Sequence, residues 1–198
     1  KAAADRTPPA PQDLVALARF LSTQGAHRRA ADLLLAAAAL LEAPPVPGAP
    51  ATSGAAPVSG AQARFEAGVE LLAARLYTQA AGLFGSLAAP ATGAPPDQPS
   101  SDLRLAALFN LGVARAGLRL DEQAIEAFTS YLSGVPGEAR AYLYLGNACF
   151  RLGRMDEARA AYRSFLDRAG PGPEASRVQH ILEGIARAPK GPGAANAP

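Results

Sequence analysis

The sequence predicts an all-α protein built as a row of helix–turn–helix repeats. Three observations predict this class. Alanine, leucine and arginine, all good helix formers, fill dense segments at residues 12–42, 61–88 and 102–188. Apolar side chains recur in these segments at helical spacing, as at Leu14 and Leu17, while β-branched residues are sparse. Finally, one pattern of residues returns along the chain at a fixed offset, which is the signature of a repeat architecture.

Composition and charge exclude several classes of function. The 198 residues, 49% of them hydrophobic, fit one ordinary domain or one repeat array. A net charge of +2 gives no whole-molecule attraction for nucleic acid or anionic lipid. The single cysteine, Cys149, excludes an internal disulfide, and two histidines beside it are too few for a usual structural zinc site. No apolar run approaches the roughly 20 residues needed to span a bilayer. We therefore expect no cofactor, metal, nucleic acid or membrane span.

Proline and glycine clusters divide the chain. They predict an extended tail at residues 1–10, linkers at 43–60 and 88–101, and a flexible tail at 189–198. Such stretches bury little apolar area for each residue that they order, so we expect them to stay extended or mobile.

The composition also indicates a source. Arginine, alanine, glycine and proline outnumber lysine, isoleucine and asparagine, which is typical of a GC-rich bacterial genome. Because the chain begins at Lys1 and not at Met, we expect an N-terminal piece before it, with an anchor possible outside this chain. The tail before Pro11 is typical of a tether behind a signal or lipid anchor. This favours the bacterial periplasm or envelope, with the cytoplasm as the alternative.

Two segments near the C-terminus match at an offset of 34 residues. Gly112 corresponds to Gly146, and several further apolar or small positions correspond at the same offset without a gap. The further pairs are Leu108 with Tyr142, Leu111 with Leu145, Leu118 with Leu152, Ala124 with Ala158, Phe128 with Tyr162, and Tyr131 with Phe165. So many matched positions are hard to obtain by chance, and they predict a repeat.

The same pattern continues upstream with longer offsets. Gly68, Ala80 and Phe84 precede their counterparts by 44 residues, and Ala18, Ala30 and Leu34 stand 50 residues before these. The surplus falls in the two proline-rich linkers, where an array of repeats tolerates insertions. The chain is therefore predicted to carry four repeats, near 11–44, 61–94, 105–138 and 139–172, inside an array that spans 11–188.

The repeated residues have a physical role. A small residue in the first helix, such as Gly146, and another in the second helix, such as Ala158, let the two helices approach closely. The bulky residue four positions later, such as Tyr162, fills the space where the next repeat stacks. Behind the last repeat, residues 173–188 predict a capping helix with one apolar stripe. The stripe comprises Val178, Ile181, Leu182 and Ile185.

These residues resemble the tetratricopeptide repeat (TPR) family, most closely in repeats 105–138 and 139–172. The resemblance implies a TPR-type α-solenoid of about four repeats, whose first helices line a concave groove that holds a peptide or helix of another protein. The repeat frame predicts the residues on the groove side: Phe65, Val69 and Leu72 in the second repeat, Phe109, Asn110 and Val113 in the third, and Arg140, Leu143, Asn147 and Phe150 in the fourth.

The predicted lining is mostly apolar, with two amides and one guanidinium. It suits an amphipathic helix or an apolar strip, with Asn110 and Asn147 available for the backbone of the ligand. The carboxylate-clamp members of the family need basic and amide side chains at places that Phe65 and Val69 occupy here, so we reject that mode of binding. Coverage of the groove by the chain's own tail or linker is the alternative to a partner.

No motif for catalysis is present, since the chain lacks GxxxxGK[ST], GxGxxG after a strand, HExxH and GxSxG. We expect His27 and His180 to face solvent, without an acidic neighbour at helical spacing, and Cys149 to be a buried apolar filler. The arginines from Arg151 to Arg168 are expected to form a solvated face with local ion pairs and not a phosphate-binding stripe.

The sequence thus predicts a non-enzymatic scaffold or adaptor for another protein, without a small-molecule substrate. The alternative is a permanent accessory subunit of a larger bacterial envelope, secretion or motility complex.

Overall fold

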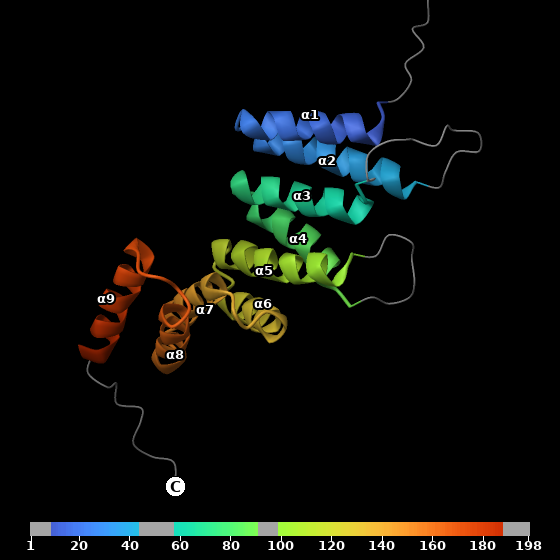
Figure 1. Cartoon of the computed structure of the whole chain (residues 1–198). Helices are drawn as coiled ribbons and strands as arrows, with labels where there is room; N and C mark the ends of the chain where they lie inside the picture. The colour runs from blue at the N-terminus through green and yellow to red at the C-terminus, as the bar shows by residue number, and fades with distance from the viewer. Residues whose placement is uncertain (1–8, 44–57, 91–98, 188–198) are drawn as a thin grey trace, which may run out of the picture. The chain divides into compact units, whose positions relative to one another are not determined.

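The computed structural model describes residues 9–43, 58–90 and 99–187, and these residues form nine α-helices and no strand (Figure 1). The all-α class is confirmed. The helices are α1 (Pro11–Thr23), α2 (His27–Glu42), α3 (Gly60–Ala73), α4 (Tyr77–Ala88), α5 (Ser101–Gly117), α6 (Asp121–Gly134), α7 (Ala139–Arg151), α8 (Met155–Leu166) and α9 (Pro173–Arg187). Most of each predicted linker, residues 1–8 of the first tail and the whole of the second tail lie outside the described residues.

Contacts divide the chain into two compact units, Lys1–Leu118 and Arg119–Pro198. The first unit holds α1 to α5, and each of these helices packs against the next along the chain, while α3 also contacts α5. Figure 1 shows α1 at one end of this row and α5 at the other. The second unit holds α6 to α9, again packed in chain order. Sequential packing of this kind is the hallmark of a solenoid.

Glycine allows the two helices of a pair to approach closely. A Cβ atom built on Gly68 would lie 2.7 Å from Cζ of Phe84, and one built on Gly146 would lie 2.6 Å from Cδ1 of Tyr162. Both aromatic side chains are buried. Since carbon atoms normally pack at 3.5–4.0 Å, only glycine fits at these two positions. The role predicted for these glycines is confirmed.

The turns between paired helices share one backbone conformation. Positive φ occurs at Gly25 (74°), Arg75 (59°), Arg119 (63°) and Gly153 (74°). These positions are separated by 50, 44 and 34 residues, which are the offsets of the sequence repeat. The left-handed conformation suits glycine and costs an arginine roughly 1–2 kcal/mol.

The helix starts differ from two of the expectations. The N-cap of α5 is Ser100, whose Oγ accepts a hydrogen bond from the backbone N–H of Leu103 at 3.2 Å. The expected cap at Ser101 and Asp102 is therefore wrong by one residue, because these residues already lie in the first turn. Asp121 is not an N-cap either, since it is the first residue of α6 and its side chain is bound by Arg151.

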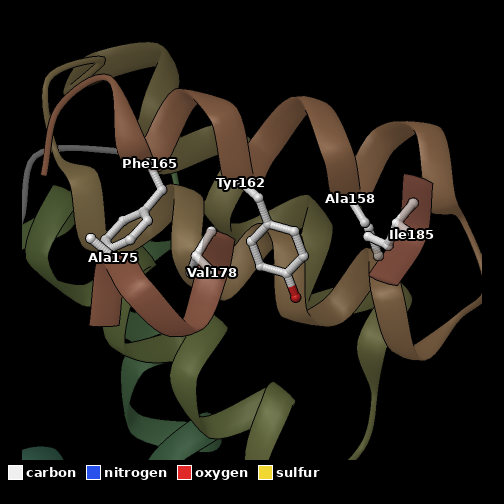
Figure 2. Packing of buried hydrophobic residues seen from close by; sticks show 7 residues of the cluster. Ala158, Tyr162, Phe165, Ala175, Val178 and Ile185 are labelled. Carbon is white, nitrogen blue, oxygen red and sulfur yellow. The ribbon is translucent and has the colours of Figure 1, made fainter. Parts of the chain in front are cut away.

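The second unit is centred on a buried cluster that α7, α8 and α9 share. Figure 2 shows Phe165 beside Ala175, Tyr162 beside Val178, and Ala158 beside Ile185, each pair joining α8 to α9. On α9, Val178 and Ile185 are buried, and the half-buried Ile181 and Leu182 pack against the cluster, so the expected apolar stripe is confirmed. Cys149 also belongs to the cluster, and burial raises the pKa of its thiol, as expected of an apolar filler.

A charged pair ties α6 to α7 beside this cluster. Nε of Arg151 donates hydrogen bonds to both carboxylate oxygens of Asp121, at 2.9 and 3.1 Å, and Nη2 donates to Oδ1. Asp121 is buried, and the hydrogen bonds from Arg151 hold the pKa of its carboxyl below the usual range, against the opposing effect of burial. Because Asp121 and Arg151 are 30 residues apart in sequence, helical spacing does not reveal this pair.

The glycine contact can be tested with two alanine substitutions in the second unit. Gly146→Ala should lower the free energy of unfolding by about 1–3 kcal/mol, because the added methyl group collides with the ring of Tyr162. Gly184→Ala is the matched control: it lies in α9 with no atom within 4 Å of the added methyl, so it should raise stability by up to about 1 kcal/mol. Urea unfolding followed by circular dichroism measures both. Equal effects of the two changes would contradict the close approach.

The Asp121–Arg151 pair predicts a dependence of stability on pH. Since the pKa of Asp121 is lower in the folded state, its contribution is present above the unfolded pKa and is lost as pH falls through the folded pKa. Asp121→Asn should cost about 1–3 kcal/mol at pH 7, and the difference from the parent protein should shrink in acid. The control is Asp156→Asn, which removes an exposed partner of Arg159 and should change little at either pH. Urea unfolding at neutral and acidic pH gives the comparison.

Candidate functional site

Two neighbouring helices of the first unit carry six of the predicted groove residues. On α3, Val69 is 40% exposed, and on both helices the remaining side chains are half-buried. The half-buried side chains are Phe65, Leu72, Phe109, Asn110 and Val113. Because α3 and α5 contact each other, the two sets of side chains belong to one surface. We refer to these six residues as the α3–α5 face.

Two members of this face are held in place by their own unit. The ring of Phe65 meets the buried ring of Phe84 edge-on, with centroids 5.6 Å apart and an interplanar angle of 68°. Such a pair fixes the orientation of Phe65. Asn110 donates a hydrogen bond from Nδ2 to the carbonyl oxygen of Ala106 at 2.9 Å. One of the amide donors expected to serve a ligand is therefore used within α5.

The other four predicted residues lie along one side of α7 in the second unit. Arg140, Leu143, Asn147 and Phe150 follow helical spacing, and we refer to them as the α7 stripe. Phe150 is 41% exposed and Arg140 is exposed, whereas Leu143 packs against the buried cluster of α7, α8 and α9. Only part of the stripe is thus open to a ligand, because Leu143 also serves the core.

The amide of Asn147 is oriented by a buried phenol. The hydroxyl of Tyr162 donates a hydrogen bond to Oδ1 of Asn147 at 2.8 Å. Burial raises the pKa of Tyr162 to about 12, so the phenol stays protonated and remains a donor at neutral pH. With the amide oxygen occupied in this way, the NH₂ group of Asn147 is the half that can serve the carbonyl of a ligand.

A charged network joins α1 to α3 beside Val69, and it was not expected from the sequence. Arg19 donates hydrogen bonds from Nη2 to Oε1 of Glu66 at 2.9 Å and from Nε to Oε2 at 3.3 Å. Glu70 accepts a hydrogen bond from Oγ of Ser22 at 2.8 Å. A hollow of about 120 Å³ is lined by Ala18, Arg19, Leu34, Glu66, Val69 and Glu70. The surface therefore becomes charged toward α1.

The repeat offsets contain the signal for this network. Arg19 stands 50 residues before Val69, and Ser22 stands 50 residues before Leu72, so both occupy groove positions of the first repeat. Glu66 likewise stands 44 residues before Asn110. Applying the groove frame to residues 11–44 as well would have placed these polar side chains beside the apolar ones.

Both histidines differ from expectation in their neighbours. His27 is half-buried, and its Nδ1 lies 2.8 Å from Oε2 of Glu70. His180 is exposed, as expected, but its Nδ1 lies 3.9 Å from Oε2 of Glu183, three residues further along α9. The expectation that neither histidine has an acidic neighbour is therefore wrong. His27 contributes to the packing of α2 against α3 through a polar contact, and facing solvent is not its main role.

The arginines of the second unit pair with nearby acids, as expected. Arg159 lies 2.7 Å from Asp156, and Arg154 lies 3.9 Å from Glu122. Within the described residues, no group of three or more histidine, cysteine, aspartate or glutamate side chains is placed to hold a metal ion. None of the described helices combines the length and the apolar character needed to cross a bilayer.

Comparisons with known proteins identify the repeat. A family model described as tetratricopeptide repeat matches residues 109–173. No curated protein matches the chain by sequence. Among solved structures, MamA from Desulfovibrio magneticus RS-1 is similar, with a TM-score of 0.65 and 15% identity over 88% of this chain and 82% of that one.

PcrH from Pseudomonas aeruginosa is similar with a TM-score of 0.52 and 20% identity, over 64% of this chain and 91% of that one. PcrH in complex with the chaperone binding region of PopD gives the same TM-score and identity, over 62% of this chain and 88% of that one. With the family model on residues 109–173 and a TPR-type fold in the described helices, the chain belongs to the tetratricopeptide repeat family.

Proposed function

We propose that the chain is a non-enzymatic scaffold that holds a peptide or helical segment of another protein. The observation that carries the proposal is the exposure of apolar side chains on first helices of the repeats, namely Val69 at 40% and Phe150 at 41%. Exposed apolar side chains that lie beside half-buried ones, as on the α3–α5 face and the α7 stripe, are typical of interaction sites. Each of the two units presents such a surface.

The chemistry of these surfaces favours an apolar or amphipathic segment as the ligand. The α3–α5 face offers four apolar side chains besides Val69, and their burial gains roughly 25 cal/mol for each Å² removed from water. On the α7 stripe, the NH₂ group of Asn147 suits a backbone carbonyl, and the exposed Arg140 suits an acidic side chain. We therefore propose a segment with an apolar side and at least one acidic residue.

Both surfaces contain side chains whose positions are set before binding. Phe65 is oriented by Phe84, and Asn147 is oriented by Tyr162. Groups that are already ordered lose little conformational entropy when a ligand binds, which strengthens the complex. The complex of PcrH with the chaperone binding region of PopD supports the same use here, since a protein of similar fold binds a segment of another protein.

A peptide-library selection on the immobilised full chain tests the proposal. Enriched peptides should share apolar residues at helical spacing, and a selected peptide should bind the parent chain in isothermal titration calorimetry. Val69→Asp and Phe150→Asp together should weaken this binding at least about tenfold, because a charge replaces apolar contact on each surface. Circular dichroism checks that helical content is unchanged.

Met155→Asp is the matched control for these variants. Met155 is 40% exposed like Val69 and Phe150, but it begins α8, a second helix, and lies outside both surfaces. An aspartate is also tolerated in the first turn of a helix. Peptide affinity should therefore be unchanged by Met155→Asp. Equal loss in the control, or full affinity in the double variant, would contradict the proposal.

A further inference from the structure

The outer side of α1 leaves large apolar side chains exposed at one end of the first unit. Phe20 is 60% exposed, more than any other large apolar side chain in the described part of the chain, and Leu17 is 48% exposed. On α2, Leu40 is 43% exposed. Figure 1 shows α1 as the last helix of its row, with no helix of the first unit beyond it. These side chains are separate from the α3–α5 face and the α7 stripe.

Helical spacing places these side chains on one surface. On α1, Leu14 and Ala18 are buried toward α2, while Leu17 and Phe20 lie on the side away from α3. On α2, Leu33 and Leu40 are seven residues apart and share one side of the helix. We refer to Leu17, Phe20, Leu33 and Leu40 as the end face.

Charged contacts confirm which sides of α1 and α2 face α3. Glu42 of α2 is paired with Arg64 of α3 at 3.1 Å, and Arg19 of α1 is paired with Glu66 of α3 at 2.9 Å. On each helix the end face lies on the opposite side from these pairs. The end face is therefore turned away from the rest of the first unit.

The end of a solenoid normally carries a polar outer surface. The outer side of α9 meets this rule, since Arg177, Gln179 and Glu183 are exposed on it. The outer side of α1 does not, because its apolar residues remain in contact with water. An apolar surface in this position is typical of an association site.

Unpaired charges lie at the two ends of this surface. Asp13 lies at the start of α1, and Arg28 and Arg29 lie at the start of α2. The tight turn at Gly25 makes α1 and α2 antiparallel, so the acidic and the basic residues occupy opposite ends of the end face. None of the three forms an ion pair with another described residue.

We propose that the end face binds the end face of a second copy of this chain. A two-fold axis in the plane of contact and perpendicular to the helices sets α1 antiparallel to α1 of the other copy. This arrangement brings the Asp13 end of each copy to the Arg29 end of the other. A two-fold axis parallel to the helices would instead bring Asp13 next to Glu42, and these like charges repel. The charges therefore select the antiparallel arrangement.

The size of the end face sets the strength of the dimer. With a rise of about 1.5 Å for each residue and a width of about 10 Å for each helix, α1 and α2 present roughly 400 Å² in each copy. A standard interface buries about 800 Å² in each partner, so this one is small. The dimer should form reversibly with a dissociation constant in the micromolar range or weaker.

Sedimentation velocity of the full 198-residue chain tests the proposal. From about 1 µM to about 500 µM, a range that brackets weak interfaces, the mass should rise from 20.2 kDa toward twice that value. Leu17→Asp with Phe20→Asp should raise the dissociation constant at least about tenfold. Phe150→Asp, which changes an exposed aromatic residue of the second unit, should leave the dimer intact.

A charge exchange tests the antiparallel arrangement. Asp13→Arg alone and Arg29→Asp alone should each weaken the dimer about threefold to tenfold, and the two together should restore it, because the opposite charges meet again. Circular dichroism confirms that each variant is folded. A monomer at every concentration overturns the proposal, as does a dimer unaffected by Phe20→Asp. If removal of residues 1–8 from such a monomer produced dimers, the occupant of the end face would be the chain's own tail.

Discussion

Close contact between a glycine in one helix and an aromatic ring in the next is the constraint on which the helical pairs depend. At Gly68 and Gly146, the facing rings of Phe84 and Tyr162 leave no room for a methyl group. The short distance between the helix axes allows both rings to be buried, and the buried ring of Tyr162 then meets Val178 of the next helix. Local close packing is thereby transmitted along the row, which explains how short helices without strong caps form a stable array.

The repeat offsets predicted the helices, the close contacts and the buried aromatic residues, because all of these follow from spacing along one chain. Contacts between side chains of different helices were predicted less well. Asp121 carries the sequence signal of an N-cap, yet its carboxylate pairs with Arg151 on the next helix. His27 was expected to face solvent, yet it meets Glu70. Partners 30 to 43 residues apart are set by how helices stack, and helical periodicity does not describe that stacking.

The candidate groove residues illustrate the same limit. The frame places Leu143 and Phe150 on one side of α7, but the structure uses Leu143 in the core and leaves Phe150 exposed. Asn147 serves both purposes, since its oxygen accepts a hydrogen bond from the buried Tyr162 while its NH₂ group remains for a ligand. A side chain shared in this way couples the surface to the packing beneath it. Position in the repeat indicates which side of a helix is concerned, and packing decides how much of each side chain remains free.

The left-handed turns also have an energetic consequence. Gly25 and Gly153 adopt positive φ without steric cost, whereas Arg75 and Arg119 adopt it against the preference of their Cβ atoms. The helices that flank each arginine must supply enough packing energy to hold the turn closed. Local opening of the chain is therefore favoured at Arg75 and Arg119 over the two glycine turns, so the breathing motions of this solenoid should begin in its interior and not at its ends.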